Sequence, residues 1–304
     1  NADPGALSAR ARERGRPQLG TLGAGNHFIE IGRVAEVFDA AAAATLGLDE
    51  DGVTLMIHSG SRGLGYQVCE DWVKVMREAM GRHGISVPDQ QLACVPINSP
   101  EGQGYLGAMN AAANYAWANR QVMMHGAEEV LVRVLGTTPR ALGMALVYDV
   151  AHNIAKFETH DVDGRAEELL VHRKGATRAF GPGADELPEA YRPLGQPVII
   201  PGDMATASYV LLGTQRAMEE TWGSTCHGAG RVMSRKEAMR RAKGRSISRE
   251  LEDRGVDVVC RSPRTLAEEM SEAYKDVSDV VEVVTEAGIS RAVARLEPLG
   301  VIKG

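Results

Sequence analysis

The sequence predicts an α+β fold in which central β-sheets are flanked by helices around one deep active-site cleft. Short apolar runs, such as residues 53–57 and 198–200, have the length of buried strands. Longer Ala-rich or amphipathic stretches, such as residues 64–82 and 105–135, have the length of helices. Several of the strand-like runs end in polar, glycine-flanked residues. Because binding residues concentrate on loops that a rigid scaffold positions, this pattern also predicts the cleft.

The composition describes an ordinary globular protein of 304 residues, with 44% hydrophobic and 24% charged residues. A net charge of −6 excludes a global basic field, so any nucleic acid must be bound by a local patch. No repeat or linker divides the chain, which predicts a single domain over residues 1–304. No apolar run approaches the roughly 20 residues of a membrane span. The four cysteines form no CxxC pair, which indicates a reducing, cytoplasmic location.

In the first half of the chain we expect a short basic helix over residues 7–14, closed by Gly15. A glycine-rich loop over residues 19–25 leads into a strand at 26–31 that residues 34–38 extend. After a polar turn at 46–51, the strand 53–57 delivers His58 to a loop. Two helical regions follow, residues 64–82 and 105–135, and we expect the second to break near Gly126.

In the second half we expect strands that alternate with polar loops, then a helical region and a last strand. The apolar run 145–150 predicts a strand that ends just before His152. The other expected strands are residues 169–171, 198–200, 208–212, 256–259 and 292–302, and the expected helices are residues 232–243 and 266–287.

The segment Ser-Thr-Cys-His-Gly-Ala-Gly-Arg, residues 224–231, is the strongest local candidate for a site. Gly228 and Gly230 allow close approach of a ligand to the backbone. A helix that begins directly afterwards would direct its free N–H groups at a phosphate in the loop. A histidine beside such a phosphate is a plausible nucleophile, which makes His227 the candidate. The alternative is an ordinary glycine-rich turn before a helix.

His27, His58 and His152 share a place at the end of an apolar run, beside small residues. Converging imidazoles with open coordination positions suit a catalytic Zn, Mn, Fe or Co ion. The alternative is that each is a hydrogen-bonded core residue. His83, His125 and His160 lie in helical or polar surroundings, and we interpret them as structural.

A basic cluster surrounds His172. Its neighbours Arg173, Lys174 and Arg178 suggest contact with phosphate, or else a solvated basic loop. Arg62 and Arg231 lie in glycine-rich loops, where a guanidinium can bind a phosphate through two parallel hydrogen bonds.

Several of these motifs together resemble the RtcB family of RNA ligases. They occur in the order seen in that family, and the resemblance extends from about Pro17 to Lys303. The matching segments are Gly-Ala-Gly-Asn-His-Phe-Ile-Glu at 23–30, His-Ser-Gly-Ser-Arg-Gly at 58–63, Ala-His-Asn-Ile at 151–154, His-Arg-Lys-Gly-Ala-Thr-Arg at 172–178, Pro-Gly-Asp-Met at 201–204 and Cys-His-Gly-Ala-Gly-Arg at 226–231.

The resemblance implies a ligase that depends on GTP and Mn²⁺ and acts in tRNA splicing and RNA repair. Such an enzyme joins an RNA 3′-phosphate, or a 2′,3′-cyclic phosphate opened to it, to a 5′-hydroxyl end. A histidine–GMP phosphoramidate is the intermediate. The partners implied are tRNA halves and other broken RNA ends, GTP, and a helper protein such as archease.

Carried over by motif, His227 resembles the guanylylated nucleophile, and His27, His58 and His152 resemble the metal ligands. Arg62, Lys174 and Arg235 are the candidates for contact with RNA phosphates. The residues that resemble the guanylate pocket are Asn26, His27, Phe28, Ile29, Glu30, His152, Asn153, Pro201, Gly202, Asp203, Met204, Ser208, His227, Gly228, Ala229, Gly230, Tyr274 and Lys303. Within it, Glu30 would accept hydrogen bonds from guanine and Lys303 would supply a cation.

The sequence departs from the family in one respect. The family has an Asp-x-x-Cys-Gly motif that completes a two-metal site, and none of the cysteines here has an aspartate three residues before it. We therefore expect this chain to be the C-terminal part of a longer ligase and to bind at most one Mn²⁺ tightly. Two other functions stay open: a metal-dependent phosphoesterase, and a fragment that binds guanylate or RNA without stand-alone activity.

Overall fold

The computed structural model describes residues 1–304, which form two compact units. The first combines Asn1–Gly23 with Ile57–Met144, and the second combines Ala24–Met56 with Ala145–Gly304. The first is helical and the second contains the β-sheets, so the predicted α+β class is confirmed. None of the helices combines the length and hydrophobicity needed to cross a membrane.

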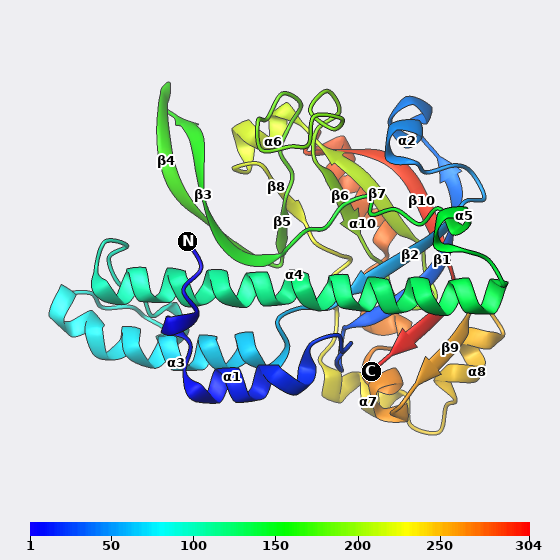
Figure 1. The fold of residues 1–304 in the computed structure, drawn as a ribbon, viewed down its shortest axis with the longest axis horizontal. Helices are drawn as coiled ribbons and strands as arrows, with labels where there is room; N and C mark the ends of the chain where they lie inside the picture. Colours follow the sequence, from blue (N-terminus) through cyan, green and yellow to red (C-terminus); the bar gives the residue numbers. More distant parts are fainter. The chain divides into compact units, whose positions relative to one another are not determined.

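The helical unit is built on α1 (Ala9–Gly15), α3 (Arg62–Met80) and α4 (Pro100–Leu135), which lie side by side (Figure 1). Their shared core contains Ala11, Leu64 and Val68 together with small residues of α4. Short elements complete the unit: α5 (Pro139–Leu142) and the 3-10 turns Pro4–Ala6, Arg16–Gln18, Gly81–His83 and Gln90–Leu92.

The expected break of α4 near Gly126 is wrong. The helix runs unbroken from the N-cap Ser99, whose hydroxyl accepts a bond from Gly102 N, to Gly136, whose positive φ ends it. A single interior glycine costs a helix about 1 kcal/mol, which the hydrogen-bonded turns on both sides offset.

The second unit is organised around a six-stranded sheet with the order β2-β1-β10-β7-β6, in which β9 also pairs with β10. The β9 pair is parallel, whereas the β1–β10, β10–β7 and β7–β6 pairs are antiparallel. The strands of this sheet are β1 (Phe28–Val37), β2 (Val53–His58), β6 (Pro197–Ile200), β7 (Ser208–Gly213), β9 (Asp257–Cys260) and β10 (Ser290–Lys303).

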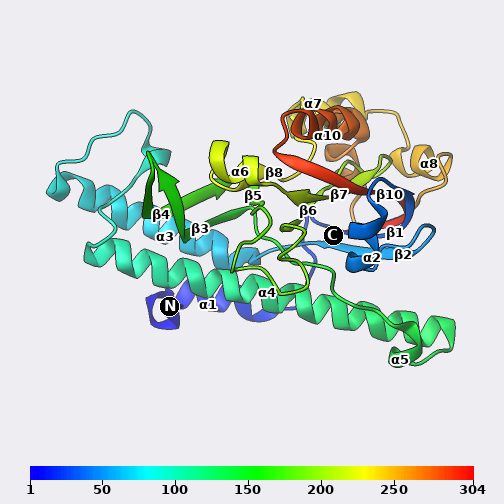
Figure 2. The ribbon, with the colours of Figure 1, turned by 90° about the horizontal axis from the view of Figure 1, so that it is seen from above.

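Helices cover both faces of this sheet, with α2 (Ala40–Leu46) on one side of β10 and α10 (Val277–Glu286) on the other (Figure 2). Strand β7 shows why, since all its residues are buried: Val210 and Leu212 pack on the α2 side, and Leu211 packs on the α10 side. A separate core lies among α7 (Arg235–Arg241), α8 (Ile247–Glu252), α9 (Pro263–Glu268), the turn Ser271–Ala273 and β9. A last short helix, α6, spans Gln215–Glu220.

Two small antiparallel sheets contain the strands next to His152 and His227. The hairpin of β3 (Asn153–Val162) and β4 (Arg165–Lys174) turns at Asp163 and Gly164, both with positive φ, as tight hairpin turns require. The second pair joins β5 (Ala176–Arg178) to β8 (Ser224–Cys226).

The expected strand at 145–150 is wrong, because the regular strand begins only at Asn153. Val147 instead packs against the main core, and its carbonyl accepts a hydrogen bond from the Tyr191 hydroxyl at 2.9 Å. An apolar run indicates that a segment is buried, but it does not by itself indicate that the segment is a strand.

The helix expected directly after the central loop begins later, at Arg235. Val232 N is already bonded to the carbonyl of Ala273, and Ser234 supplies the N-cap. The free N–H groups of α7 therefore begin several residues beyond His227, and the predicted phosphate cradle from this helix is not formed next to the histidine.

Candidate functional site

The rings of His152 and His227 face each other with their centroids 4.6 Å apart. His227 directly follows β8, and His152 directly precedes β3. Burial lowers the pKa of His152 to about 4, with smaller contributions from the neighbouring His227 and Lys174. Burial also lowers the pKa of His227. Both imidazoles are therefore neutral near pH 7, as a nucleophile or a metal ligand must be.

Gly175 connects the two histidines. Its N–H donates to the carbonyl of His152 at 3.0 Å, and its backbone is hydrogen-bonded to the His227 ring. Its φ of 67° lies in the left-handed region, and an added Cβ would stand 3.5 Å from Cε1 of His227. A glycine here lets the chain turn between β4 and β5 while it stays against the imidazole.

The loop after His227 is attached to two other segments. Ala229 N donates to the carbonyl of Pro201 at 3.1 Å, and Lys275 N donates to the carbonyl of Gly230 at 3.0 Å. A Cβ on Gly228 would stand 3.4 Å from the same Pro201 carbonyl oxygen. Gly228 therefore permits close contact with the segment at Pro201, whereas the predicted approach of a ligand to this loop stays a prediction.

The opening residues of β1 lie opposite the end of β10, with Phe28 aligned with Lys303. The Lys303 ammonium stands 5.6 Å from the Phe28 ring centroid, and burial lowers its pKa to about 8. Burial and the neighbouring charge of Asp203 raise the pKa of Glu30 to about 8. Glu30 therefore carries a proton near pH 7 and is a hydrogen-bond donor as well as an acceptor.

The segment after β6 folds into a turn around Asp203. Its carboxylate accepts hydrogen bonds from Ala205 N at 2.9 Å, from the Thr206 hydroxyl at 2.9 Å and from the Ser271 hydroxyl at 2.5 Å. The buried Ser208 hydroxyl accepts a bond from Gly202 N at 3.4 Å. These bonds fix the predicted pocket segment 201–204 on the scaffold.

Tyr274 and Arg231 meet around a buried carboxylate, Glu269. The Tyr274 hydroxyl donates to Glu269, and Arg231 Nη1 lies 3.1 Å from both the Tyr274 oxygen and the Glu269 carboxylate. Arg235 Nε reaches the other Glu269 oxygen at 3.1 Å. The charge of Glu269 also favours the charged form of Lys303, so one carboxylate organises the basic residues of this region.

The predicted residues therefore divide between the two units. The sheet-bearing unit contains His27, His152, His227, Glu30 and the rest of the predicted guanylate pocket, whereas His58 and Arg62 belong to the helical unit. No group of three or more His, Cys, Asp or Glu side chains in the structure has the arrangement of a metal site, and the three-histidine site stays a prediction.

The basic residues proposed for phosphate contact have different environments. Lys174 ends β4, and its charge acts on both histidines. Arg62 begins α3 with a φ of 53°, and its Nε donates to the Thr21 hydroxyl at 3.3 Å. Arg173, which the sequence grouped with these residues, is buried and paired with Glu158, so the interpretation of that stretch as a solvated loop is wrong for it.

Sequence reasoning missed Glu269 and Gly175 as parts of the site. Glu269 stands in an acidic helical stretch without any motif, and only tertiary contacts reveal its partners. Gly175 was noticed only as a part of a basic segment, and its contact with His227 depends on the β5–β8 pairing, which no local pattern predicted.

Comparison with known proteins identifies the family. The family model described as "tRNA-splicing ligase RtcB" matches residues 1–304. Over its whole length the chain is 59% identical to the tRNA-splicing ligase RtcB of Archaeoglobus fulgidus and 53% identical to that of Methanococcus maripaludis, and it covers 63% of each. It is 55% identical to the relative from Pyrococcus abyssi, of which it covers 33%. The chain belongs to the RtcB family and spans less than two thirds of the length of these relatives.

Proposed function

We propose that this chain carries the nucleotidyl-transfer site of a GTP- and Mn²⁺-dependent RNA ligase. In this proposal a nitrogen of His227 attacks the α-phosphorus of GTP. A P–N bond forms, the bond to the β-phosphate oxygen breaks, and pyrophosphate leaves. GMP then passes to an RNA 3′-phosphate, and the 5′-hydroxyl of the second RNA end displaces GMP as the strand is sealed. The natural RNAs would be tRNA halves or other broken RNA ends.

One observation carries the proposal: a neutral, oriented imidazole at the start of a glycine loop in a chain of this family. A ring nitrogen bonded to the backbone of Gly175 fixes the orientation of His227, and the opposite nitrogen keeps a lone pair for attack. A protonated histidine would have no such lone pair, so the lowered pKa supports the role.

The guanylate pocket is proposed at the neighbouring segments. Glu30 would bind the guanine edge through its carboxyl group, and the Phe28 ring and the Lys303 ammonium would line the same pocket. Ser208 and the 201–204 turn would form its wall, and Tyr274 another part of it. Buried polar groups discriminate strongly against a base that leaves them unpaired.

The chemistry of the proposed ligands suits a metal ion, because a neutral imidazole offers the nitrogen lone pair that Mn²⁺ accepts. His152, with its pKa lowered to about 4, has that form over the whole physiological range. His27 and His152 would hold the ion, and His58 is the third ligand of the hypothesis. When bound, Mn²⁺ would neutralise negative charge on the phosphate groups.

Labelling with α-³²P-GTP in the presence of Mn²⁺ tests the proposal. A ligase transfers the label covalently to the protein, whereas a metal-dependent phosphoesterase releases product without labelling it. A chain that only binds guanylate retains label until it is denatured. Covalent labelling that is absent from the full-length wild-type ligase, or that survives in its His227→Ala variant, would refute the proposed function.

A further inference from the structure

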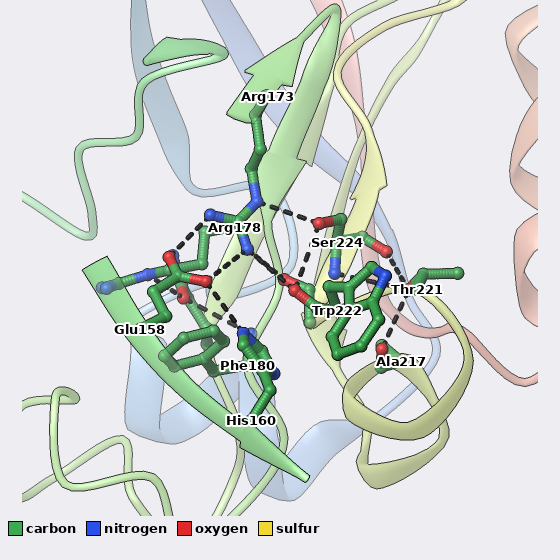
Figure 3. Close-up of polar contacts among 11 residues, drawn as sticks. Glu158, His160, Arg173, Arg178, Phe180, Ala217, Thr221, Trp222 and Ser224 are labelled. Carbon is green, nitrogen blue, oxygen red and sulfur yellow. Dashed lines mark hydrogen bonds and ion pairs between the residues drawn. The ribbon is translucent and has the colours of Figure 1, made fainter. Parts of the chain in front are cut away.

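A buried ion pair joins the two strands of the β3–β4 hairpin (Figure 3). Arg173 Nη1 and Nη2 contact the two oxygens of Glu158 at 2.6 and 2.8 Å, and His160 Nε2 lies 3.1 Å from the same carboxylate. The Glu158 and Arg173 side chains are only 2% and 1% exposed. The carboxylate therefore fixes the guanidinium plane in a bidentate arrangement.

The other donors of Arg173 reach the segment that enters β8. Its Nε donates to the Ser224 hydroxyl at 2.9 Å, and Nη2 donates to the carbonyls of Trp222 at 2.8 Å and Gly223 at 3.3 Å. Figure 3 shows the guanidinium between Glu158 and this segment. Arg173 therefore holds the hairpin to the chain that leads, three residues after Ser224, to His227.

The held segment has an unfavourable backbone conformation. Trp222 has a φ of 53°, in the left-handed region that costs a residue with a side chain roughly 1–2 kcal/mol. The Trp222 ring is packed edge-on against His160, with ring centroids 5.4 Å apart. Contacts from the hairpin thus add to the hydrogen bonds that Gly223 makes with Ala217 and Ala179 in holding a turn that the local sequence does not favour by itself.

The two residues that flank the hairpin, His152 and Gly175, are also the residues that lie against His227. His152 directly precedes β3, and Gly175 directly follows β4. Both lie against the His227 ring. A change in how the hairpin sits on β8 would therefore change the placement of His227 relative to both of them.

We propose that Arg173, fixed by Glu158, is a positioning residue that aligns the His227 imidazole with His152 and Gly175 for guanylyl transfer. The inference rests on the proposed role of His227. Arg173 does not touch the reacting atoms and acts through the Trp222–Ser224 backbone. A lysine can replace it only in part, because an ammonium lacks the planar fork that bonds a carboxylate and two carbonyls together.

Stability alone does not require this ion pair. Replacing a buried pair with apolar residues of similar volume is often neutral or stabilising. The double variant Glu158→Met with Arg173→Met tests alignment without leaving a buried charge unpaired. Arg173→Lys tests the geometry with the charge retained, and Arg165→Lys, on an exposed part of the same strand, is the matched control.

The first measurement is the single-turnover rate of GMP labelling, with GTP affinity measured separately. We expect a loss of about tenfold or more in rate, because small misplacements of reacting groups have such effects, and a change of less than about twofold in affinity. Arg173→Lys should lie between the double variant and the wild type, and Arg165→Lys should match the wild type.

The second measurement needs neither GTP nor metal. NMR spectra of protein with labelled histidines should show shifted His152 and His227 ring signals in Arg173→Lys and in the double variant, but not in Arg165→Lys. Normal labelling rates together with unmoved ring signals in folded variants would overturn the inference. Failure of this inference can be distinguished from failure of the proposed function, because the latter would appear as labelling that persists in His227→Ala.

Discussion

Glu30 and Lys303 lie on the neighbouring strands β1 and β10, and both have a pKa of about 8. The pKa of Glu30 is raised to this value, and the pKa of Lys303 is lowered to it. Burial is the largest cause for both, since it disfavours the charged form of either group. The acid is thereby retained in its neutral form to higher pH, and the base becomes neutral at lower pH. A region that excludes water to this degree suits the recognition of an uncharged base edge.

The two shifts predict a stability minimum near pH 8. Between about pH 4.5 and 8 the folded chain retains the Glu30 proton that the unfolded chain has lost, which lowers stability as pH rises. Below about pH 6.5 the lowered pKa of His152 acts in the opposite direction and offsets this loss, so the net fall in stability is expected between about pH 6.5 and 8. Between about pH 8 and 10.5 the unfolded chain retains the Lys303 proton that the folded chain has lost, so stability rises. Denaturant unfolding across this range should show the minimum.

Variants separate the two contributions to this pH dependence. Glu30→Gln should remove the fall in stability between about pH 6.5 and 8 and leave the alkaline part unchanged. Lys303→Met should remove the rise between about pH 8 and 10.5 and leave that fall unchanged. The matched control is Glu36→Gln, on the same strand but half exposed. A wild-type stability that does not vary between pH 6.5 and 8 would contradict the Glu30 assignment.

The second prediction concerns the stability of the bond between GMP and the protein toward acid and alkali. GMP attached to His227 through a P–N bond should be released by mild acid and resist alkali, the opposite of an acyl phosphate. Peptide sequencing should place the label on the peptide that contains residues 224–231. Label on Lys303 or His172 would show that the nucleophile has been misassigned.

The third prediction concerns RNA phosphates. Arg62→Gln, Lys174→Gln and Arg235→Gln should each weaken RNA joining and reduce the salt dependence of RNA binding by about one counterion, because a phosphate contact releases one. Guanylylation should be largely spared, and Arg165→Gln is the exposed control. Equal loss of labelling and joining would mean that the residue serves the nucleotide site instead.

The fourth prediction tests the sheet core. Leu211 is completely buried between β7 and α10, so Leu211→Ala should lower the free energy of unfolding by about 2–5 kcal/mol. Val259→Ala on β9, where the side chain is 65% exposed, should change it by less than about 0.5 kcal/mol. Similar losses for both variants would contradict the packing described here.

Much of the scaffold was predictable from local patterns. The runs 53–57, 198–200 and 208–212 form β2, β6 and β7 as expected. Short stretches of β-branched and apolar residues between turns usually form buried strands. The last strand was also predicted, although its parallel pairing with β9 depends on contacts distant in sequence.

The arrangement of the candidate site was less predictable than its sequence motifs. The motifs named His27, His152 and His227, but the approach of His152 to His227 depends on the β3–β4 hairpin, most of which has no strong alternation of apolar residues. Arg173 illustrates the limit: a basic residue between two basic neighbours gives no local sign that it will be buried against Glu158.

The position of β7 determines when its amide protons can exchange with solvent. All its residues are buried, it is paired on both edges by β6 and β10, and helices cover its two faces. Its amide protons can therefore meet solvent only when the sheet-bearing unit unfolds as a whole. In hydrogen–deuterium exchange, the amides of residues 209–212 should be the last of this unit to exchange, and their rates should report its global stability.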